Sequence, residues 1–410
     1  MNFEHSERAL DYLKRIDAFM REHIEEQEEQ ARMKMFDRDP LYQWTPPPEL
    51  EELKEKARAE GLWNLFLPDE EYGAGLSNVE YAPLAERMGQ SFLAPEIFNC
   101  SAPDTGNMEV LYHFGSETQK EQWLKPLLAG EIRSAFCMTE PDVASSDATN
   151  MEATATIEGD EVVLNGVKWW STGAGYPNCD VAIFMALTDP EAHKYRQHSM
   201  VLVPMDTRGV KIDHMLTTMG YWDEPSGHGQ ISFENVRLPV SSIIGGPGRA
   251  FEIAQSRLGP GRIHHCMRLI GQAEKALRLT CERATTRFAF GKPLANLGGN
   301  RERIADARIA IEQARLLVLR CAWLIDNKGV LGALSEISQI KVAVPNMAQK
   351  VIDMAIQLHG GAGVSNQFPL PAMWTHARVL RIADGPDEVH RGVIARLELS
   401  KYVNRDVARG

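Results

Sequence analysis

The spacing of apolar residues changes twice along this chain of 410 residues, and the two changes restrict the folds that it can adopt. Up to Ile132 the apolar residues recur at the three- and four-residue spacing of helices. After Ser134 they alternate with the period of two that is typical of strands, and from Ala250 the helical spacing returns. The sequence therefore predicts an α+β protein with a helical domain over residues 1–133, a β domain over 134–246 and a helical bundle over 247–410.

The alternating segment begins with a predicted hairpin. Residues 152–170 carry two alternating runs, and Glu158, Gly159 and Asp160 between them form a turn signal. Further apolar runs predict strands at Val181–Leu187, Met200–Met205 and Gln230–Leu238.

The helical segments have features of their own. Residues 6–36 have one apolar face, and the glutamates of Glu25–Glu29 are interpreted as solvated, before Pro46–Pro48 breaks the chain. Residues 333–359 predict a helix in which Pro345 is a candidate kink. Residues 301–326 predict a long helix whose apolar stripe suits a bundle or a subunit interface, formed by Ile304, Ala307, Ile311, Ala314, Leu317 and Val318.

Charge and composition argue against several classes of function. A net charge of −12 disfavours a nucleic-acid partner, because phosphate binding requires a positive surface. No stretch approaches the roughly 20 apolar residues of a membrane-spanning helix, and residues 1–7 do not resemble a signal peptide. The six cysteines lack metal-ligand spacing, and the adjacent His264 and His265 would point to different faces of a helix. We therefore expect a cytoplasmic protein with reduced thiols and no bound metal.

Two segments of the β region carry candidate chemistry, although each also has a purely structural interpretation. The loop Phe136–Asp147 is rich in hydroxyls and backbone donors, which suit a polar ring or a phosphate but also a turn-rich domain junction. Lys168–Gly173 places two tryptophans before two hydroxyls, an arrangement that can hold a planar cofactor or simply end a strand.

Two more candidate segments lie in the second helical region. Arg287–Pro293 combines an arginine with two phenylalanines, which can grip a dinucleotide or merely terminate a helix. Gln357–Gly363 is rich in glycine, but it does not follow a predicted strand and is therefore a poor Rossmann fingerprint.

The most informative stretch is Ala383–Arg391, near the C-terminus. Asp384 stands before Gly385 and Pro386, and a helical pattern follows. Pro is favoured at a first helical position because no backbone N–H is needed there, and Gly lets the backbone approach a bound group closely. Asp384 is thereby left at the start of the helix, where it can either cap the helix or be aimed at a substrate atom.

The four candidate segments are Phe136–Asp147, Lys168–Gly173, Arg287–Pro293 and Gln357–Gly363. In this order, and within a chain of helical, β and helical regions, they resemble the acyl-CoA dehydrogenase family of flavoproteins. Gly115–Lys120 and Gly130–Ile132 resemble the residues that precede the family's Thr-Glu-Pro signature, here Thr139–Pro141. Phe233–Pro239 resembles the strand that closes its β domain, and Arg287–Pro293 resembles its R-x-x-F-G-K segment. The resemblance covers nearly the whole chain and implies that the middle domain is β-barrel-like and that the C-terminal domain is a four-helix bundle.

The resemblance also implies a cofactor, a substrate and partners. The cofactor is FAD, and its contacts would fall at Phe136, Met138, Thr139, Ser146, Trp170, Ser171, Thr172, Arg287, Phe290, Gln357, Gly361, Pro386 and Glu388. Family members are usually homotetramers or dimers, so Arg287, Phe290, Gln357 and Gly361 would reach the FAD of a neighbouring subunit. The acyl-CoA would be held by Ser146, Arg262, Gly385 and Arg396, and an electron-transferring flavoprotein would accept the electrons.

The chain departs from the family at the catalytic base. Most members use Glu in a Tyr-Glu-Gly-Thr setting, where this chain has Ala383-Asp384-Gly385-Pro386. The shorter side chain of Asp384 requires the base or the substrate to shift. The run resembles a subgroup that in animals is fused to phosphotransferase-like domains. The implied reaction removes the α-proton with Asp384 and transfers the β-hydride to the flavin, giving a trans-2-enoyl-CoA.

Three alternatives accompany this interpretation. Nitroalkane oxidases also resemble the family and use Asp as the base, but the arginines at 262 and 396 favour a dehydrogenase. A DNA-binding alkylation-response flavoprotein needs a basic face, which the net charge of −12 disfavours. A non-catalytic acyl-CoA-binding scaffold would have no use for an acid at position 384.

Overall fold

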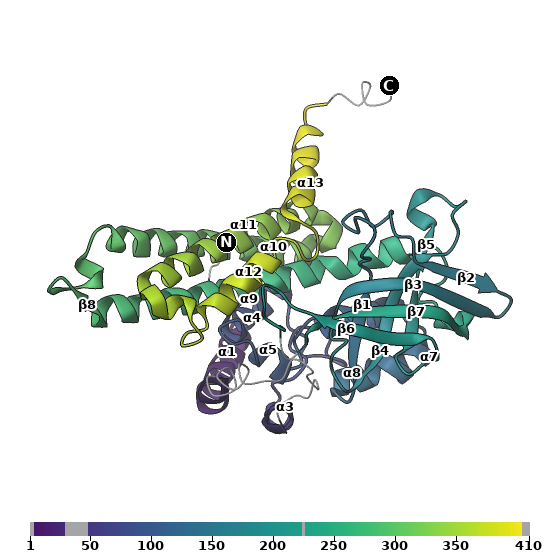
Figure 1. The fold of residues 1–410 in the computed structure, drawn as a ribbon, viewed down its shortest axis with the longest axis horizontal. Coiled ribbons are helices and arrows are strands. Elements are labelled where there is room, and N and C mark those ends of the chain that lie inside the picture. Colours follow the sequence, from purple (N-terminus) through teal and green to yellow (C-terminus); the bar gives the residue numbers. More distant parts are fainter. Residues whose placement is uncertain (1–3, 29–47, 224–225, 404–410) are drawn as a thin grey trace. The chain divides into compact units, whose positions relative to one another are not determined.

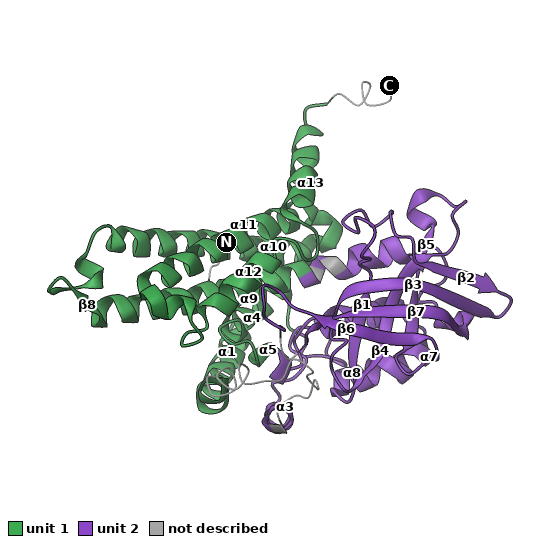
Figure 2. Ribbon diagram, in the orientation of Figure 1, with its two compact units in different colours: residues 1–38, 76–95, 262–410 green, residues 39–75, 96–261 purple. Residues whose placement is uncertain are grey.

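The computed structural model describes residues 4–28, 48–223 and 226–403. The chain divides into two compact units that interleave along the sequence (Figure 2). Unit 1 comprises residues 1–38, 76–95 and 262–410, and unit 2 comprises residues 39–75 and 96–261. The first helix of the chain therefore belongs to the same unit as the C-terminal helices. The predicted division into the consecutive domains 1–133, 134–246 and 247–410 does not show this grouping.

Unit 1 is helical (Figure 1). Helix α11 packs against α10, α12 and α13, and α4 packs against both α1 and α10. Residues 262–403 are mostly helical, as predicted, except for a short hairpin of β8 (Phe288–Ala289) and β9 (Lys292–Pro293) and the turns between helices, and Pro345 lies inside α11. The helices of this unit are α1 (Glu7–Phe19), which a π-helical segment (Met20–Ile24) continues, α4 (Asn78–Met88), the part of α9 (Ala250–Thr286) that follows residue 261, α10 (Asn300–Gly332), α11 (Leu334–His359), α12 (Leu370–Val379) and α13 (Asp387–Leu399).

Of the glutamates that follow α1, Glu25 and Glu26 are exposed as predicted, whereas Glu28 is not. Glu25 forms an ion pair with Arg87 of α4 at 2.7 Å. Glu28 is buried, accepts a hydrogen bond from the backbone N–H of Phe92 and lies 3.3 Å from Nζ of Lys275 on α9. The prediction is wrong at Glu28, because its carboxylate contacts the backbone of Phe92 and the side chain of Lys275, which are distant in the sequence and which the local pattern of charges does not reveal. Glu29 and Pro46–Pro47 lie outside the described residues.

The apolar stripe predicted on residues 301–326 faces the interior of unit 1. Along α10, Ile311, Ala314 and Val318 are buried, as are Ala307 and Cys321. These four members of the predicted stripe, Ala307, Ile311, Ala314 and Val318, are covered within one chain and belong to the bundle, whereas Ile304 and Leu317 are half-buried.

Unit 2 contains a seven-stranded curled sheet in the order β1-β4-β2-β3-β7-β6, with β5 paired to β4. The predicted hairpin is confirmed: β2 and β3 pair antiparallel, and Glu158 lies opposite Glu161 across a turn in which Gly159 has a φ of 64°. The strands are β1 (Arg133–Cys137), β2 (Thr154–Glu158), β3 (Glu161–Thr172), β4 (Cys179–Leu187), β5 (His198–Pro204), β6 (Val210–Leu216) and β7 (His228–Pro239). The helices of this unit include α3 (Pro48–Ala59), α6 (Asp104–Phe114), α7 (Glu117–Gln119) and α8 (Lys125–Ala129).

Strands β1 and β6 were not predicted. Strand β1 pairs in parallel with β4 and is buried at four of its five positions, so it lacks the alternation of a half-exposed strand. Its first residue, Arg133, forms buried ion pairs with Glu96 and Asp104, and Glu96 also pairs with Lys54 at 2.7 Å. Strand β6 is the last in the sheet order, and its residues are half-buried or exposed.

The carboxyl of Glu109 on α6 makes the stability of unit 2 depend on pH. Glu109 is buried, and its Oε2 has no hydrogen-bond partner among the described residues. Burial raises the pKa of this carboxyl to about 8, and the charge of Arg257 offsets only part of the rise. The folded chain therefore binds the proton more tightly than the unfolded chain. The resulting stabilisation is complete below the unfolded pKa of 4.5 and is lost as the pH rises towards 8.

We predict that Glu109→Gln will stabilise the protein at about pH 9 and change its stability little at about pH 5. The amide keeps the volume of the side chain but cannot ionise, so it avoids a cost of up to about 5 kcal/mol, at about 1.4 kcal/mol per pKa unit for a rise from 4.5 to about 8. Urea unfolding at both pH values measures the difference, and Glu117→Gln on the exposed face of α7 serves as the control. A stability difference independent of pH would contradict the assignment.

Candidate active site

Asp384 lies in a tight turn between α12 and α13. Its φ is 56° and that of Gly385 is 102°, so two consecutive residues adopt left-handed backbone conformations. Asp tolerates this region better than most residues, whereas a Cβ at position 385 would lie 2.9 Å from Nε2 of His390. Pro386 is extended and occupies the N-cap position, so α13 begins at Asp387, one residue later than predicted. Asp384 is therefore two residues away from the cap position.

Three side chains from three helices hold the backbone of this turn. Nε of Arg262 on α9 donates to the carbonyl oxygen of Asp384 at 3.0 Å, and Nε2 of His390 on α13 lies 3.2 Å from the same oxygen. Nζ of Lys341 on α11, which is fully buried, donates to the carbonyl of Leu380 at 2.5 Å and lies 3.4 Å from that of Gly385. Contacts to the backbone from three helices thus set the position of Asp384.

His265 lies beside the carboxylate of Asp384, with Nε2 3.5 Å from Oδ2. Burial and, to a smaller extent, the charge of Arg268 lower the pKa of this imidazole to about 3, although the charge of Asp384 opposes the shift. Nη2 of Arg268 lies 3.2 Å from Nδ1, and a guanidinium can only donate, so Nδ1 is the acceptor. The neutral ring therefore carries its proton on Nε2, directed at Asp384.

Sequence reasoning missed the role of His265. It follows Arg262 by three residues, a spacing that places both side chains on one face of α9. That spacing is the signal that could have found it, because both side chains lie at the Asp384 turn. The neighbouring His264 faces elsewhere: it is buried against the ring of Tyr81, at a centroid distance of 4.9 Å.

In unit 2, the loop after β1 and the end of β3 lie side by side. The backbone N–H of Trp169 donates to the carbonyl of Thr139 at 3.0 Å, and Nζ of Lys168 donates to that of Met138 at 2.9 Å. Lys168 is buried and also pairs with Glu140 at 2.6 Å. The loop after β1 and the end of β3 thus form one surface. They are about 30 residues apart in the sequence, so no local pattern connects them.

The predicted residues on this surface differ in exposure. The side chain of Trp170 is 39% exposed although its φ is 53°, and Thr172 is half-buried. Met138 and Thr139 are half-buried, and Ser146 is exposed. Ser171 is fully buried, so a ligand at this position would have to contact its backbone. Phe136 is half-buried, with the guanidinium of Arg257 3.8 Å from its ring centroid.

The predicted residues of unit 1 fall into two groups. Arg283 on α9 contacts the carbonyl of His359 at 3.5 Å, which brings the exposed Arg287 and Phe290 to the same end of the bundle as Gln357 and Gly361. Along α11, Gln357 is 16 residues beyond Lys341, or about 24 Å at the rise of a helix. These four residues therefore do not join the Asp384 turn within one chain.

The residues of α13 also separate. Asp387 is buried and pairs with Arg381 at 2.9 Å, whereas Glu388 is exposed. Arg396 is exposed and lies nine residues beyond the start of the helix, about 14 Å along its axis.

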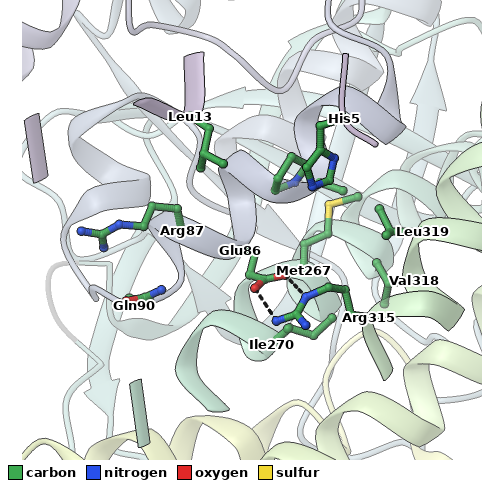
Figure 3. Close-up of a pocket in the computed structure, with 12 residues that line it drawn as sticks. His5, Leu13, Glu86, Arg87, Gln90, Met267, Ile270, Arg315, Val318 and Leu319 are labelled. Carbon is green, nitrogen blue, oxygen red and sulfur yellow. Dashed lines mark hydrogen bonds and ion pairs between the residues drawn. The ribbon is translucent and has the colours of Figure 1, made fainter. Parts of the chain in front are cut away.

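Unit 1 also encloses a cavity of about 240 Å³ (Figure 3). Glu86 and Arg315 form an ion pair on its wall at 2.8 Å. None of the predicted site residues lines it, so it is not the site predicted from the sequence. Its lining consists of His5, Leu13, Ala82, Pro83, Glu86, Arg87, Gln90, Met267, Ile270, Arg315, Val318 and Leu319.

Other kinds of site find no support in the part of the chain that the structure describes. Within it there is no cluster of His, Cys, Asp and Glu that could hold a metal, and no helix is long and apolar enough to cross a membrane. All six cysteines are unpaired, and five of them are buried.

The three parts of the chain match the three domain families of one class of flavoenzyme. The acyl-CoA dehydrogenase N-terminal, middle and C-terminal domains match residues 6–131, 135–236 and 248–399. The chain therefore belongs to the acyl-CoA dehydrogenase family, a family of oxidoreductases, and its helical, curled-sheet and helical parts have the fold of that family.

Relatives of the chain agree with this assignment. Acyl-CoA dehydrogenase family member 11 of Gallus gallus is 53% identical over 400 residues, which cover 97% of this chain but 51% of that protein. The chain thus spans about half the length of this relative. A solved structure of an acyl-CoA dehydrogenase homologue from Mycobacterium abscessus has a TM-score of 0.95 and 65% identity, covering 98% of this chain and 100% of that one. The protein PigA, solved with FAD and proline, has a TM-score of 0.84 and 25% identity, over 97% of this chain and 98% of that one.

We predict that His265 is neutral and carries its proton on Nε2 from about pH 5 to about pH 8, because its pKa is lowered to about 3. Nitrogen-15 spectra of histidine-labelled protein measure the protonation of each ring nitrogen, and the loss of one signal in His265→Gln assigns it. The exposed His193 is the internal control. An Nδ1-protonated ring, or a ring that titrates near neutrality, would contradict the prediction.

Proposed function

We propose that the chain is an FAD-dependent acyl-CoA dehydrogenase that converts an acyl-CoA thioester to the trans-2-enoyl-CoA and passes its electrons to an electron-transferring flavoprotein. Family membership supports the reaction type. The observation that carries the proposal is Asp384, a carboxylate in a left-handed turn whose backbone is held by Arg262, Lys341 and His390.

The residues of unit 2 fit a flavin in their chemistry. Trp170 presents an exposed aromatic surface, Thr172 presents a hydroxyl beside it, and the loop at Met138 and Thr139 is held against the same strand end. An aromatic surface and convergent polar groups are what a planar, partly polar ring requires. A structural neighbour is solved with FAD, which supports the same cofactor here. When bound, FAD would accept the hydride from the substrate.

Asp384 would serve as the base that removes the α-proton of the thioester. The N–H on Nε2 of His265 would hold the carboxylate in one orientation, and the neutral ring adds no positive charge that would make the carboxylate a weaker base. Gly385 would let the backbone approach the substrate, and Arg396 and Ser146 would contact the CoA part. Nε of Arg262 already bonds to the carbonyl of Asp384, so Arg262 would support the base as well as the substrate.

We predict that Asp384→Asn will bind FAD and acyl-CoA but reduce its flavin roughly 10²–10⁴-fold more slowly than the parent. The amide keeps the shape of the side chain but cannot accept the α-proton. Anaerobic mixing with a panel of acyl-CoA thioesters, followed by flavin bleaching, measures the rate. Glu398→Gln, at an exposed position of α13 that has no predicted contact with the cofactor or substrate, is the matched control and should reduce its flavin at the parental rate.

Three outcomes of the same experiment would count against the proposal. Denatured parent protein that releases no flavin would exclude the cofactor. Rapid bleaching of Asp384→Asn would exclude Asp384 as the base. Indifference of the parent to every acyl-CoA, with rapid turnover of a nitroalkane by O₂, would identify the oxidase alternative instead.

We further propose that the chain forms a homo-oligomer in which Arg287, Phe290, Gln357 and Gly361 complete a neighbour's cofactor site. Phe290 is 96% exposed, and a large apolar ring in that position suits a second copy. A second stripe on α10, distinct from the buried one, is formed by Ile309, Leu316 and Trp323 at intervals of seven residues, each about half exposed. Regular apolar residues at this spacing suit packing against another helix.

We predict that Leu316→Glu will weaken the oligomer without unfolding the chain, because it places a charge in an exposed apolar stripe rather than in the core. Light scattering measures the mass and circular dichroism the helix content. Gln313→Glu, on the same helix and also exposed, is the control. A chain that is monomeric before the substitution, or an unchanged mass after it, would argue against this interface.

A further inference from the structure

A buried histidine in unit 2 is held between a carboxylate and a hydroxyl. Nδ1 of His228 on β7 lies 2.9 Å from Oγ1 of Thr172, the residue that faces it across the β3–β7 ladder. Nε2 of His228 lies 2.9 Å from Oδ2 of Asp223, which makes the two an ion pair by distance, and it forms no hydrogen bond of regular geometry among the described residues. The ring of Trp170 contacts the same imidazole edge to face, at a centroid distance of 5.5 Å.

The chemistry of Asp223, His228 and Thr172 determines which of them donates and which accepts in each contact. An ionised carboxylate can only accept, so the proton of a neutral His228 lies on Nε2, towards Asp223. Nδ1 is then an acceptor, and the Thr172 hydroxyl donates its single proton to it. A hydroxyl that donates inward has only its lone pairs left for any other partner. Asp223 thus determines, through His228, that Thr172 accepts a hydrogen bond from a ligand and does not donate one.

We propose that Asp223 and His228 are positioning residues that fix the Thr172 hydroxyl as a hydrogen-bond acceptor towards the flavin ring and thereby favour its reduced form. This inference rests on the proposed FAD site, in which Thr172 lies against the ring. A flavin has a bare nitrogen at N5 when oxidised and an N–H there when reduced. An acceptor beside N5 therefore stabilises the reduced ring, whereas a donor would stabilise the oxidised one.

Charge alone would act in the opposite direction, and this makes the inference testable. A carboxylate near the ring repels the electrons that the ring gains, so its removal would raise the reduction potential. In our proposal, Asp223→Asn no longer fixes the proton of His228 on Nε2. The Thr172 hydroxyl can then donate its proton to the flavin instead of to His228, and the reduction potential of the flavin falls. The sign of the change separates the two causes.

The test is the midpoint potential of the bound flavin, measured by equilibration with a reference dye on the alkaline side of neutrality, where imidazole is neutral. Asp223→Asn should shift the ratio of reduced to oxidised flavin about tenfold towards the oxidised form, or about 30 mV for a two-electron couple. Thr172→Val should lower the potential by a similar amount, because it removes the acceptor. Asp213→Asn, which removes a carboxylate of the same sheet that bonds to Ser232, should leave the potential unchanged.

The double variant decides whether the effect passes through the hydroxyl. Asp223→Asn in the Thr172→Val background should produce no further change, because the group that Asp223 orients is gone. An equal change in both backgrounds, a rise in potential, or no change with flavin fully bound would overturn this inference and leave the proposed dehydrogenase intact. A protein that binds no flavin would overturn both. If Asp223→Asn folds poorly, His228→Leu is the second variant, and it should lower the reduction potential of the flavin in the same way.

Discussion

The contact between Lys341 and the carbonyls of Leu380 and Gly385 is the interaction on which the candidate active site depends. The lysine is fully buried, and burial lowers its pKa although the charge of Asp384 opposes the shift. A buried ammonium needs oxygen partners, and two carbonyls of a turn with left-handed residues provide them. The same contact stabilises the lysine and holds Asp384 in a conformation that the backbone alone disfavours.

In unit 2, too, a buried lysine donates to a backbone carbonyl of a loop. Lys168 is buried inside β3, donates to the carbonyl of Met138 and pairs with Glu140, whose carboxylate accepts from the backbone of Glu152 and Ala153. In both units, an amine from a regular element fixes an irregular segment that carries site residues. This follows from a general constraint, because loops near a ligand are precise only when a rigid scaffold satisfies their backbone polar groups.

Histidines with fixed tautomers are the second recurring element. His265 receives a hydrogen bond from Arg268 and presents Nε2–H to Asp384, while His228 faces Asp223 and offers Nδ1 to Thr172. In each case a group with only one hydrogen-bonding role, a guanidinium or a carboxylate, determines which nitrogen carries the proton. The direction of a hydrogen bond at the proposed site is thus set by a residue that does not itself contact the ligand.

The sequence by itself determined the order of the helical and β-rich regions and the β2–β3 hairpin, because hydrophobic periods are local, but it did not reveal strands β1 and β6. It also singled out Asp384, because a Gly-Pro step before a helix is a local signal, and it placed the site segments through motifs of a few adjacent residues. The tertiary structure alone decided which stripe of α10 is covered, that Glu28 is buried, and that His265 meets Asp384 while His228 meets Thr172 and Asp223. Except for Asp223 and His228, which are five residues apart, these partners are separated by between 56 and 247 residues. Such contacts depend on strand register and helix packing, which are set by the whole core. The sequence neighbours of each contacting residue therefore carry no signal of its distant partner.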